Sequence, residues 1–316
     1  MGRSVAGVLT VVIVGLLTSP LIVAAHTTRR DTTSVSTAAS GSRTSASSSA
    51  PGTSAMAAAP MAAARDSSAL VAVLQQLVAE SGASAGVTVV ELGGSDPLTW
   101  SLDGSAVFTA ASTYKLVALM MEAQNIASGS TDPNGLVCYQ DSDYEAGWFD
   151  DYAPGACFTR NELASRAAQQ SDNTAGHMLV RDLGGSDALN AWAVSVGTTA
   201  SAFFDGNTTT ASDLAVLWTA EANGGLGGTS AQAWLYPLLT GTTTEAGVPA
   251  GVPGSTVVHK TGSIDAVDND AALVTAGPDG AYLLVVMTDG LGGSAGWGLI
   301  ASISAAVWQT EQSRVH

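Results

Sequence analysis

Apolar residues recur three and four positions apart between residues 70 and 78, which predicts an amphipathic helix. Asp66 can cap the start of this helix and Gly82 can end it. Residues 86–92 and 98–102 are short apolar runs separated by a turn rich in glycine and proline, so they predict a β-hairpin. The first part of the patterned chain is therefore expected to be a helix followed by two paired strands.

The middle of the patterned region predicts helices. Residues 116–121 form an apolar run of good helix formers without a breaker. Thr159 can cap a helix over residues 160–170, and a further helix follows over residues 174–183. Another helix is expected to include residues 214–218.

Strand patterns return near the C-terminus. Residues 256–260, 271–275 and 281–288 predict three strands, the last two joined by a tight turn, and residues 294–309 predict a final helix. Strands thus lie at both ends of the patterned region and helices in between. The expected fold class is α/β of the α+β kind, with an antiparallel sheet flanked by the terminal helices and an inserted all-helical lobe.

The chain divides into three segments. Residues 1–25 combine a basic Arg3, an apolar run and a small-residue end, which is typical of a secretory signal peptide; an uncleaved anchor through residues 5–23 is the alternative. Residues 26–65 are rich in Ser, Thr and Ala and predict a disordered linker, and residues 66–316 predict one folded domain. We therefore expect a secreted or cell-surface protein, with membrane tethering as the second possibility.

The distribution of charged residues along the chain limits the classes of partner that we expect. The first 65 residues contain five arginines and one aspartate, whereas the remainder contains six basic and 26 acidic residues. Such an acidic body argues against nucleic acid or an anionic membrane as a partner, and we expect a monomer that acts on a small molecule. No cofactor or metal is expected: acidic residues alternate over 141–145 as in a calcium loop, but that loop's glycine and distal glutamate are missing.

The only two cysteines, Cys138 and Cys157, enclose an acidic, aromatic loop. An even pair in an exported chain usually forms a disulfide. We therefore predict that they are bonded to each other and brace this loop.

Residues 108–115 are the candidate centre of the chemistry. If Ser112 lies in the first turn of the apolar helix, Lys115 is three residues along on the same helix face, with Cβ atoms roughly 5–6 Å apart. A serine hydroxyl needs a base to become a nucleophile, and a buried lysine amine with a lowered pKa is such a base. The helix N-terminus adds N–H groups suited to an oxyanion.

Two further motifs make this pair more specific. Ser-Asp-Asn stands at residues 171–173 and Lys-Thr-Gly at residues 260–262. Ser-x-x-Lys, Ser-Asp-Asn and Lys-Thr-Gly occur in this order in class A β-lactamases and penicillin-binding proteins. Moreover, Lys115 and Lys260 are the only lysines of the chain, and both fall within these motifs.

Residues 66–311 resemble class A serine β-lactamases and, more loosely, the penicillin-binding D,D-peptidases. The resemblance implies a β-lactamase/D,D-peptidase-like fold and an acyl-enzyme mechanism. It makes Ser112 the acylated nucleophile, Lys115 its proton acceptor and Ser171 the group that passes a proton to the leaving nitrogen. Lys260, together with Thr261, is implied to hold the substrate carboxylate.

The resemblance also implies further substrate-binding residues. Asn173 would bind the amide side chain of the substrate, and the backbone N–H groups of Ser112 and Ser263 would form the oxyanion hole. Tyr152 corresponds to an aromatic residue at the lip of the pocket.

The sequence departs from the family pattern at two points. Family β-lactamases carry a glutamate that positions the deacylating water, whereas residues 197–207 form a short loop whose only acid is Asp205. The usual arginine after Lys-Thr-Gly is also missing near residues 268–270. Asp205 is therefore the candidate for deacylation, provided that the loop points it into the pocket.

Three functions follow from these observations. The first is an exported β-lactamase-like serine hydrolase with slow deacylation. The second is a D,D-peptidase or esterase that acts on peptidoglycan stem peptides or small esters. The third is a non-catalytic module that binds β-lactams or cell wall. The motifs around Ser112 favour the first, and the short loop favours the other two.

Overall fold

The computed structural model describes residues 67–94 and 97–314. The predicted signal segment, the linker and the proposed cap at Asp66 lie outside the described residues, so the domain boundaries stay predictions. Within the described ranges, none of the helices is both long enough and apolar enough to cross a membrane.

Five antiparallel strands form the main sheet in the order β2-β1-β9-β8-β7. They are β1 (Ser84–Glu91), β2 (Thr99–Leu102), β7 (Val257–Ile264), β8 (Val267–Gly277) and β9 (Gly280–Asp289). Because β1 pairs with β9, the hairpin near the start of the domain is joined directly to the strands near its end. The predicted antiparallel sheet is confirmed, and β7, which carries Lys-Thr-Gly, is an edge strand.

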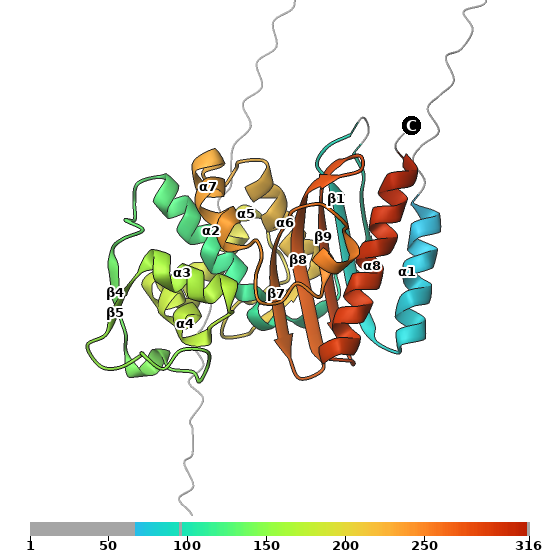
Figure 1. Ribbon diagram of the computed structural model, residues 1–316. Coiled ribbons are helices and arrows are strands. Elements are labelled where there is room, and N and C mark those ends of the chain that lie inside the picture. Colours follow the sequence, from blue (N-terminus) through green and yellow to red (C-terminus); the bar gives the residue numbers. More distant parts are fainter. Residues whose placement is uncertain (1–66, 95–96, 315–316) are drawn as a thin grey trace, which may run out of the picture. The chain divides into compact units, whose positions relative to one another are not determined.

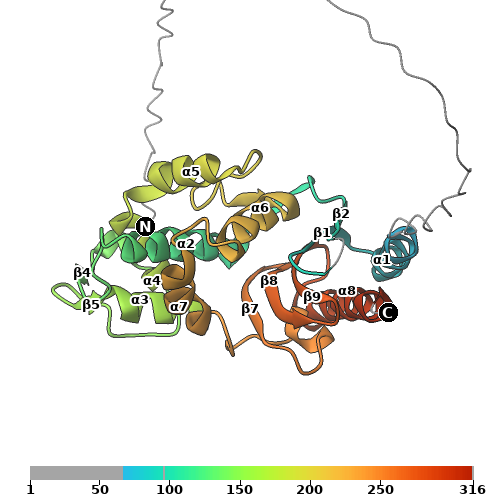
Figure 2. The ribbon, with the colours of Figure 1, turned by 90° about the horizontal axis from the view of Figure 1, so that it is seen from above.

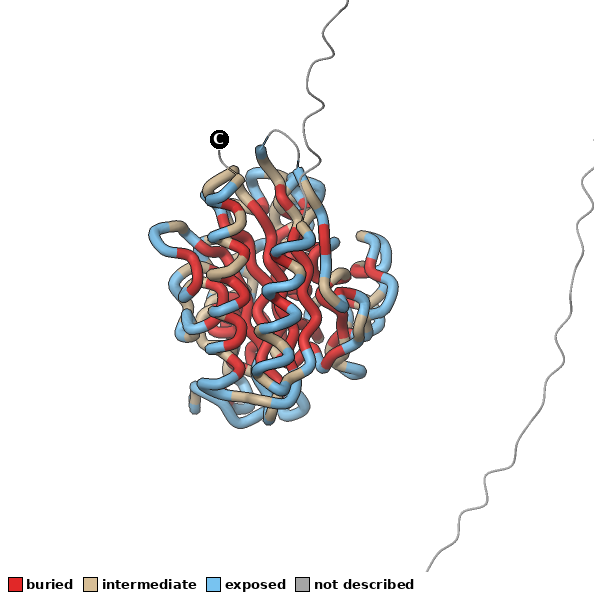
Figure 3. Tube along the Cα trace, turned by 90° about the vertical axis from the view of Figure 1, so that its right-hand side faces the viewer, coloured by how far each residue is buried: buried red, intermediate tan, exposed pale blue. Residues whose placement is uncertain are grey.

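Both faces of this sheet are buried. In β9, Leu283, Val285 and Met287 belong to one apolar cluster, whereas Leu284 and Val286 belong to the other. Successive side chains of a strand point to opposite faces, so a strand covered on both sides reads as an unbroken apolar run. Figure 3 shows the strands as buried trace behind partly exposed helices.

The terminal helices cover one face of the sheet. Helices α1 (Ser68–Ser81) and α8 (Gly293–Arg314) pack against each other and lie side by side in Figures 1 and 2. Leu70 and Leu74 of α1 join Ile300, Ile303 and other α8 residues in the apolar cluster on that face. The first and last predicted helices therefore form one layer, as expected.

The other face packs against the helical lobe. Its helices are α2 (Tyr114–Ala127), α3 (Arg160–Gln169), α4 (Asn173–Asp182), α5 (Gly185–Val196), α6 (Ala211–Ala222) and α7 (Gly228–Leu238). Helices α5 and α7 were not predicted. Each begins after a glycine with φ of 102°, Gly184 and Gly227, without a capping side chain, and Pro237 lies inside α7. Tertiary packing therefore supports these helices where the local start signals are missing.

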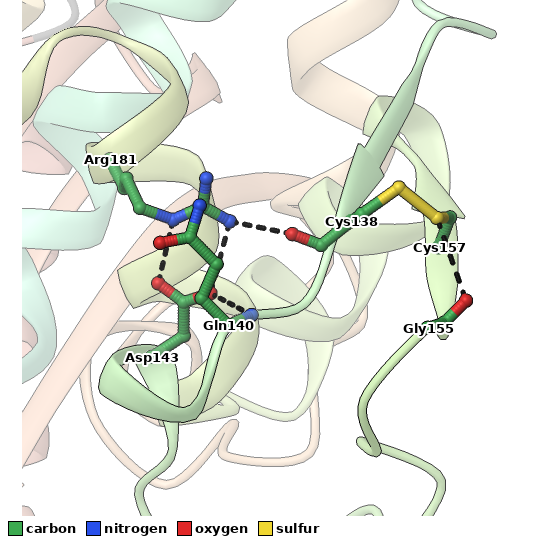
Figure 4. The surroundings of a disulfide bond; sticks show 6 residues. All are labelled: Cys138, Gln140, Asp143, Gly155, Cys157 and Arg181. Carbon is green, nitrogen blue, oxygen red and sulfur yellow. Dashed lines mark hydrogen bonds and ion pairs between the residues drawn. A yellow bond between two sulfur atoms is a disulfide. The ribbon is translucent and has the colours of Figure 1, made fainter.

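Short ladders and 3₁₀ turns connect these layers. The ladders join β3 (Val107–Thr109) to β6 (Thr208–Thr210) and β4 (Leu136–Cys138) to β5 (Cys157–Thr159), and the turns are η1 (Ala111–Thr113), η2 (Asp141–Asp143) and η3 (Val248–Gly251). Cys138 and Cys157 lie opposite each other in the β4–β5 ladder and form the predicted disulfide, which Figure 4 shows.

Candidate active site

Ser112 and Lys115 meet at the junction of the sheet and the helical lobe. Ser112 lies in the 3₁₀ turn η1, one residue before the residue that caps α2, and not in the first α-helical turn that we predicted. Lys115 lies in α2, and its Nζ is 3.0 Å from Ser112 Oγ. The tighter turn thus keeps the predicted nucleophile and base within hydrogen-bond reach.

Two residues of the Ser-Asp-Asn motif, Ser171 and Asn173, contact the Lys115 amine. Lys115 Nζ donates to Asn173 Oδ1 at 2.6 Å and to the Ser171 carbonyl oxygen at 2.7 Å, and it lies 3.4 Å from Ser171 Oγ. Ser171 therefore faces Lys115 from the connection between α3 and α4.

Lys260 completes the constellation from β7. Its Nζ donates to Ser171 Oγ at 3.0 Å and to the Thr261 carbonyl oxygen at 2.8 Å. Ser171 Oγ thus lies between the two lysine amines. The four residues predicted to be catalytic are brought together by one network, although they are up to 148 positions apart in the chain.

Both lysines have lowered pKa values. Burial lowers the pKa of Lys115 well below its ordinary value, and repulsion from Lys260 lowers it further. Burial lowers the pKa of Lys260 to about 7, against the opposing effect of the Asp270 carboxylate. Each lysine is only 1% exposed. Both effects on Lys115 favour its neutral amine, which is the form that can take a proton from Ser112.

Unusual backbone geometry sets the position of the two serines. Ala111 and Ser171 have φ values of 48° and 57°, in the left-handed region that non-glycine residues seldom adopt. Across the site, a Cβ on Gly262 would lie 2.9 Å from the Ser112 nitrogen. The glycine of Lys-Thr-Gly is therefore required for β7 to approach η1 so closely.

Asn269 on β8 holds the backbone just before the nucleophile. Its Nδ2 donates to the carbonyl oxygens of Thr109 and Ala110, at 2.9 and 3.2 Å, while its Oδ1 accepts from Thr288 N. Asn269 is fully buried. A contact between residues 159 positions apart leaves no local signal in the sequence, so this role of Asn269 was not predicted.

A cavity of about 350 Å³ opens at Ser112. It is lined by residues from η1, the disulfide loop, α4, the short loop before β6 and the end of β7: Ala111, Ser112, Tyr114, Glu145, Asn173, His177, Phe204, Asp205, Asn207, Ser263 and Ile264. Asn173 and Ser263 belong to this lining, and Thr261 lies two residues before Ser263 on β7. Their individual roles stay predictions.

A larger cavity, of about 650 Å³, lies elsewhere in the domain, between α6 and the edge formed by β1 and β2. Its lining contains threonine, serine, asparagine and apolar side chains but no titratable group. It therefore offers neither a base nor a charged anchor, and the smaller cavity at Ser112 is the candidate active site.

The short loop before β6 does reach the cavity. Phe203 is fully buried, and the ring of Phe204 packs edge-on against Tyr114 and His177, with centroids 5.4 and 5.2 Å away. Asp205 follows at the cavity lining and is exposed. The apolar side chains thus pack the loop down and leave its only acid at the site.

Tyr152 occupies a different place from a pocket lip. It is 9% exposed, packs against Phe158, and its hydroxyl donates to Asp172 Oδ1 at 2.7 Å. Asp172 Oδ1 also accepts from Ala175 N and thereby caps α4. In this structure Tyr152 is therefore tied to the motif that presents Ser171 and does not line the cavity.

Two residues that we did not predict also line the cavity, Glu145 and His177. Asn173 Nδ2 donates to Glu145 Oε1 at 2.6 Å, and His177 Nε2 lies 3.3 Å from Glu145 Oε2. The sequence suggested a solvated acidic loop and a packed or surface histidine. The one available signal for Glu145 was its place in the loop that the disulfide closes; Thr174 and Arg181 bond this loop to α4.

Comparisons with known proteins agree with this geometry. The model of the beta-lactamase enzyme family matches residues 69–310. A solved structure of PBP-A is 27% identical, with a TM-score of 0.71, and the match covers 77% of this chain and 95% of that one. A point variant of PBP-A, in an acyl-enzyme complex with penicillin G, is 28% identical over 76% and 95% of the two chains, again with a TM-score of 0.71.

A β-lactamase from Sphaerobacter thermophilus is 26% identical, with a TM-score of 0.68, over 78% of this chain and 97% of that one. No curated protein sequence matches the chain.

Proposed function

Because this chain belongs to the beta-lactamase enzyme family, we propose that it is an exported serine hydrolase that β-lactams acylate at Ser112. The observation that carries the proposal is the 3.0 Å separation of Ser112 Oγ from Lys115 Nζ, whose pKa is lowered by burial and by Lys260. Acyl transfer of this kind requires a nucleophile beside a group that can take its proton.

The contacts between these residues support the following acylation step. Ser112 Oγ bonds to the lactam carbonyl carbon while its proton passes to Lys115 Nζ. The lactam C–N bond then breaks, and the leaving nitrogen takes a proton from Ser171 Oγ, which lies within reach of both lysine amines. Lys115 then returns a proton to Ser171, so both residues regain their starting protonation, Ser112 carries the ester, and the net result is transfer of the Ser112 proton to the lactam nitrogen.

Export is supported by the signal-like residues 1–25 and by the disulfide, since such bonds persist mainly in oxidising compartments. Cleavage of the signal and an uncleaved anchor lead to the same extracytoplasmic location for the folded domain.

Intact-mass spectrometry over time after addition of a penicillin tests the proposal. We expect one adduct with the full mass of the penicillin, located by peptide mapping on Ser112 and absent from the Ser112→Ala variant. Absence of an adduct and of turnover across several β-lactams would overturn it.

Deacylation is expected to be slower than acylation. The loop that carries a water-activating glutamate in family β-lactamases here offers only Asp205, which is shorter by one methylene. Loss of a positioned general base typically costs about 10²–10⁴ in rate. The acyl-enzyme should therefore accumulate.

The variant Asp205→Asn tests this step. If Asp205 activates the water, the half-life of the adduct should lengthen further, by tenfold or more on the scale of general-base catalysis. Decay of the adduct is followed by mass spectrometry after excess penicillin is removed. Rapid multiple turnover that Asp205→Asn does not change would show that another group activates the water.

A D,D-peptidase activity is the second candidate, favoured by the short loop without glutamate and by the similarity to PBP-A. Release of D-alanine from a stem peptide, absent in Ser112→Ala, would support it. A protein that is acylated by penicillin but neither releases D-alanine nor turns over would act as a binding module.

A further inference from the structure

The charged groups that line the catalytic cavity are predominantly acidic. Glu145 and Asp205 line it, together with His177, and no lysine or arginine belongs to its lining. Within the described ranges, every arginine is engaged elsewhere, in ion pairs with acidic residues: Arg160 with Asp182, Arg166 with Asp151, Arg181 with Asp143, and Arg314 with Glu311. No arginine therefore neutralises the negative charge at the cavity; the opposing charge on Glu145 comes from Lys115, whose Nζ contacts the same Asn173 from behind the cavity lining.

Glu145 is oriented by a hydrogen bond at one carboxylate oxygen, while the other oxygen lies beside His177, with which it forms an ion pair only when His177 is protonated. Oε1 accepts from Asn173 Nδ2 at 2.6 Å, and Oε2 lies 3.3 Å from His177 Nε2. The Glu145 side chain is nevertheless 52% exposed. It is thus an oriented anion that a ligand in the cavity can still reach.

The loop that carries Glu145 is itself fixed against α4. Glu145 N donates to Thr174 Oγ1, which in turn donates to the Glu145 carbonyl oxygen, at 3.0 and 2.8 Å. Figure 4 shows Arg181 of α4 beside the disulfide, bonded to the Asp143 carboxylate and to the Cys138 carbonyl oxygen. The disulfide and these contacts place the carboxylate before any substrate binds, which lowers the entropic cost of binding.

The hydrogen bond between Glu145 and Asn173 indicates which part of a substrate would lie near the Glu145 carboxylate. Lys260 and Thr261, on β7, are proposed to hold the substrate carboxylate, and Asn173, on α4, to bind the amide of the acyl side chain. Glu145 contacts Asn173 and is therefore expected on the acyl side, and Asp205 lines the same cavity.

We propose that Glu145 and Asp205 form an ammonium-binding subsite that selects substrates with a protonated amine on the acyl side chain. The inference rests on the proposed function and adds its substrate class. Each carboxylate is exposed, so each charge pair contributes modestly. We expect an overall preference of roughly threefold to tenfold for an amine over an uncharged side chain.

Three penicillins with a phenylacetyl side chain test the proposal, differing only in a hydrogen, an ammonium or a carboxylate beside the amide carbonyl. The second-order rate constant for acylation of the full-length protein is measured for each, at one fixed pH near neutrality. The expected order is ammonium, hydrogen, carboxylate, and added salt should compress the differences.

Variants assign the preference to the two carboxylates. Glu145→Gln keeps an oxygen that can accept from Asn173, and Asp205→Asn is similarly isosteric; each should reduce the ratio of the ammonium to the hydrogen penicillin, and both together should bring it to about one. Asp150→Asn is the matched control, because it removes the same charge from an exposed position of the disulfide loop outside the cavity lining. It should leave the ratio unchanged.

The possible failures can be told apart. Equal rates for the three penicillins, or an ammonium preference that persists in the double variant, would overturn the subsite while leaving acylation at Ser112 intact. Absence of Ser112 labelling by all three would instead overturn the proposed function.

Discussion

Lys260 is a residue of the site whose charge changes near neutral pH. Burial lowers its pKa to about 7, so that in the free protein its ammonium form is lost as the pH rises through neutrality. The charged form is the one proposed to hold the substrate carboxylate. The pH dependence of acylation should therefore report Lys260 directly.

We expect kcat/KM, or the second-order acylation rate constant, to fall on the alkaline side near pH 7, because this constant reports groups of the free enzyme. In Lys260→Arg, the guanidinium stays charged throughout, and the alkaline fall should move beyond the measurable range. The measurement is a pH profile of acylation by one uncharged-side-chain penicillin. An alkaline limb that stays in place in Lys260→Arg would assign it to another group.

At the scale of elements, the edge strand β7 contributes His259 to a buried cluster with two carboxylates, Asp270 and Glu245. His259, next to Lys260 in the chain, is fully buried; its Nδ1 lies 2.9 Å from Asp270 Oδ1 and its Nε2 lies 3.1 Å from Glu245 Oε1. His259 N also donates to the Leu239 carbonyl oxygen. The cluster thus ties the connection after α7 to β7 and β8.

The stability of this cluster should depend on pH. Burial lowers the pKa of His259, but Asp270 and Glu245 outweigh burial and raise it from 6.5 to about 9. Because the folded state holds the proton more tightly, the stabilisation is complete below pH 6.5 and is lost as the pH rises through about 9. Lys260 titrates with the opposite sign, so the wild type must be compared with His259→Gln.

We predict that the difference in unfolding free energy between wild type and His259→Gln is largest at low pH and shrinks toward pH 9. Urea unfolding at a series of pH values measures it. A difference that is independent of pH would mean that His259 is neutral in the folded protein.

The disulfide belongs to the same scale, since it closes the loop that joins β4 to β5. Replacing both cysteines in Cys138→Ser/Cys157→Ser should lower the free energy of unfolding by about 3 kcal/mol, as the chain-entropy model gives for a loop of this size. Urea unfolding of the double variant measures this, with reduced wild type as the control. Two alkylatable thiols in the untreated protein would contradict the pairing itself.

At the scale of the whole molecule, the two apolar clusters and the complete catalytic network lie within residues 67–314. We therefore predict that a chain without residues 1–65 folds and is acylated at an unchanged rate. Circular dichroism and the acylation assay on both chains test this. A truncated protein that unfolds or reacts tenfold more slowly would show that the N-terminal segment contributes to the domain.

The reacting residues and most of the helices and strands could be predicted from the sequence, but two helices could not. The three motifs by themselves identified the residues of the network, because nucleophilic chemistry restricts residue type and order. The paired strands, the terminal helices and the disulfide followed from periodicity and composition, which are local properties. Helices α5 and α7 did not, since glycines stand where capping residues would signal their starts.

Only the tertiary structure decided which distant groups face the cavity. Glu145 lines the cavity because its loop is bonded to α4, and Asn269, which is fully buried, fixes the backbone just before Ser112. A carboxylate in a polar loop has the same local sequence whether it faces solvent or a nucleophile. The amino-acid sequence by itself therefore determined the reacting groups and the layers of the fold, whereas three-dimensional packing decided which charges surround them, because that depends on contacts between segments far apart in the chain.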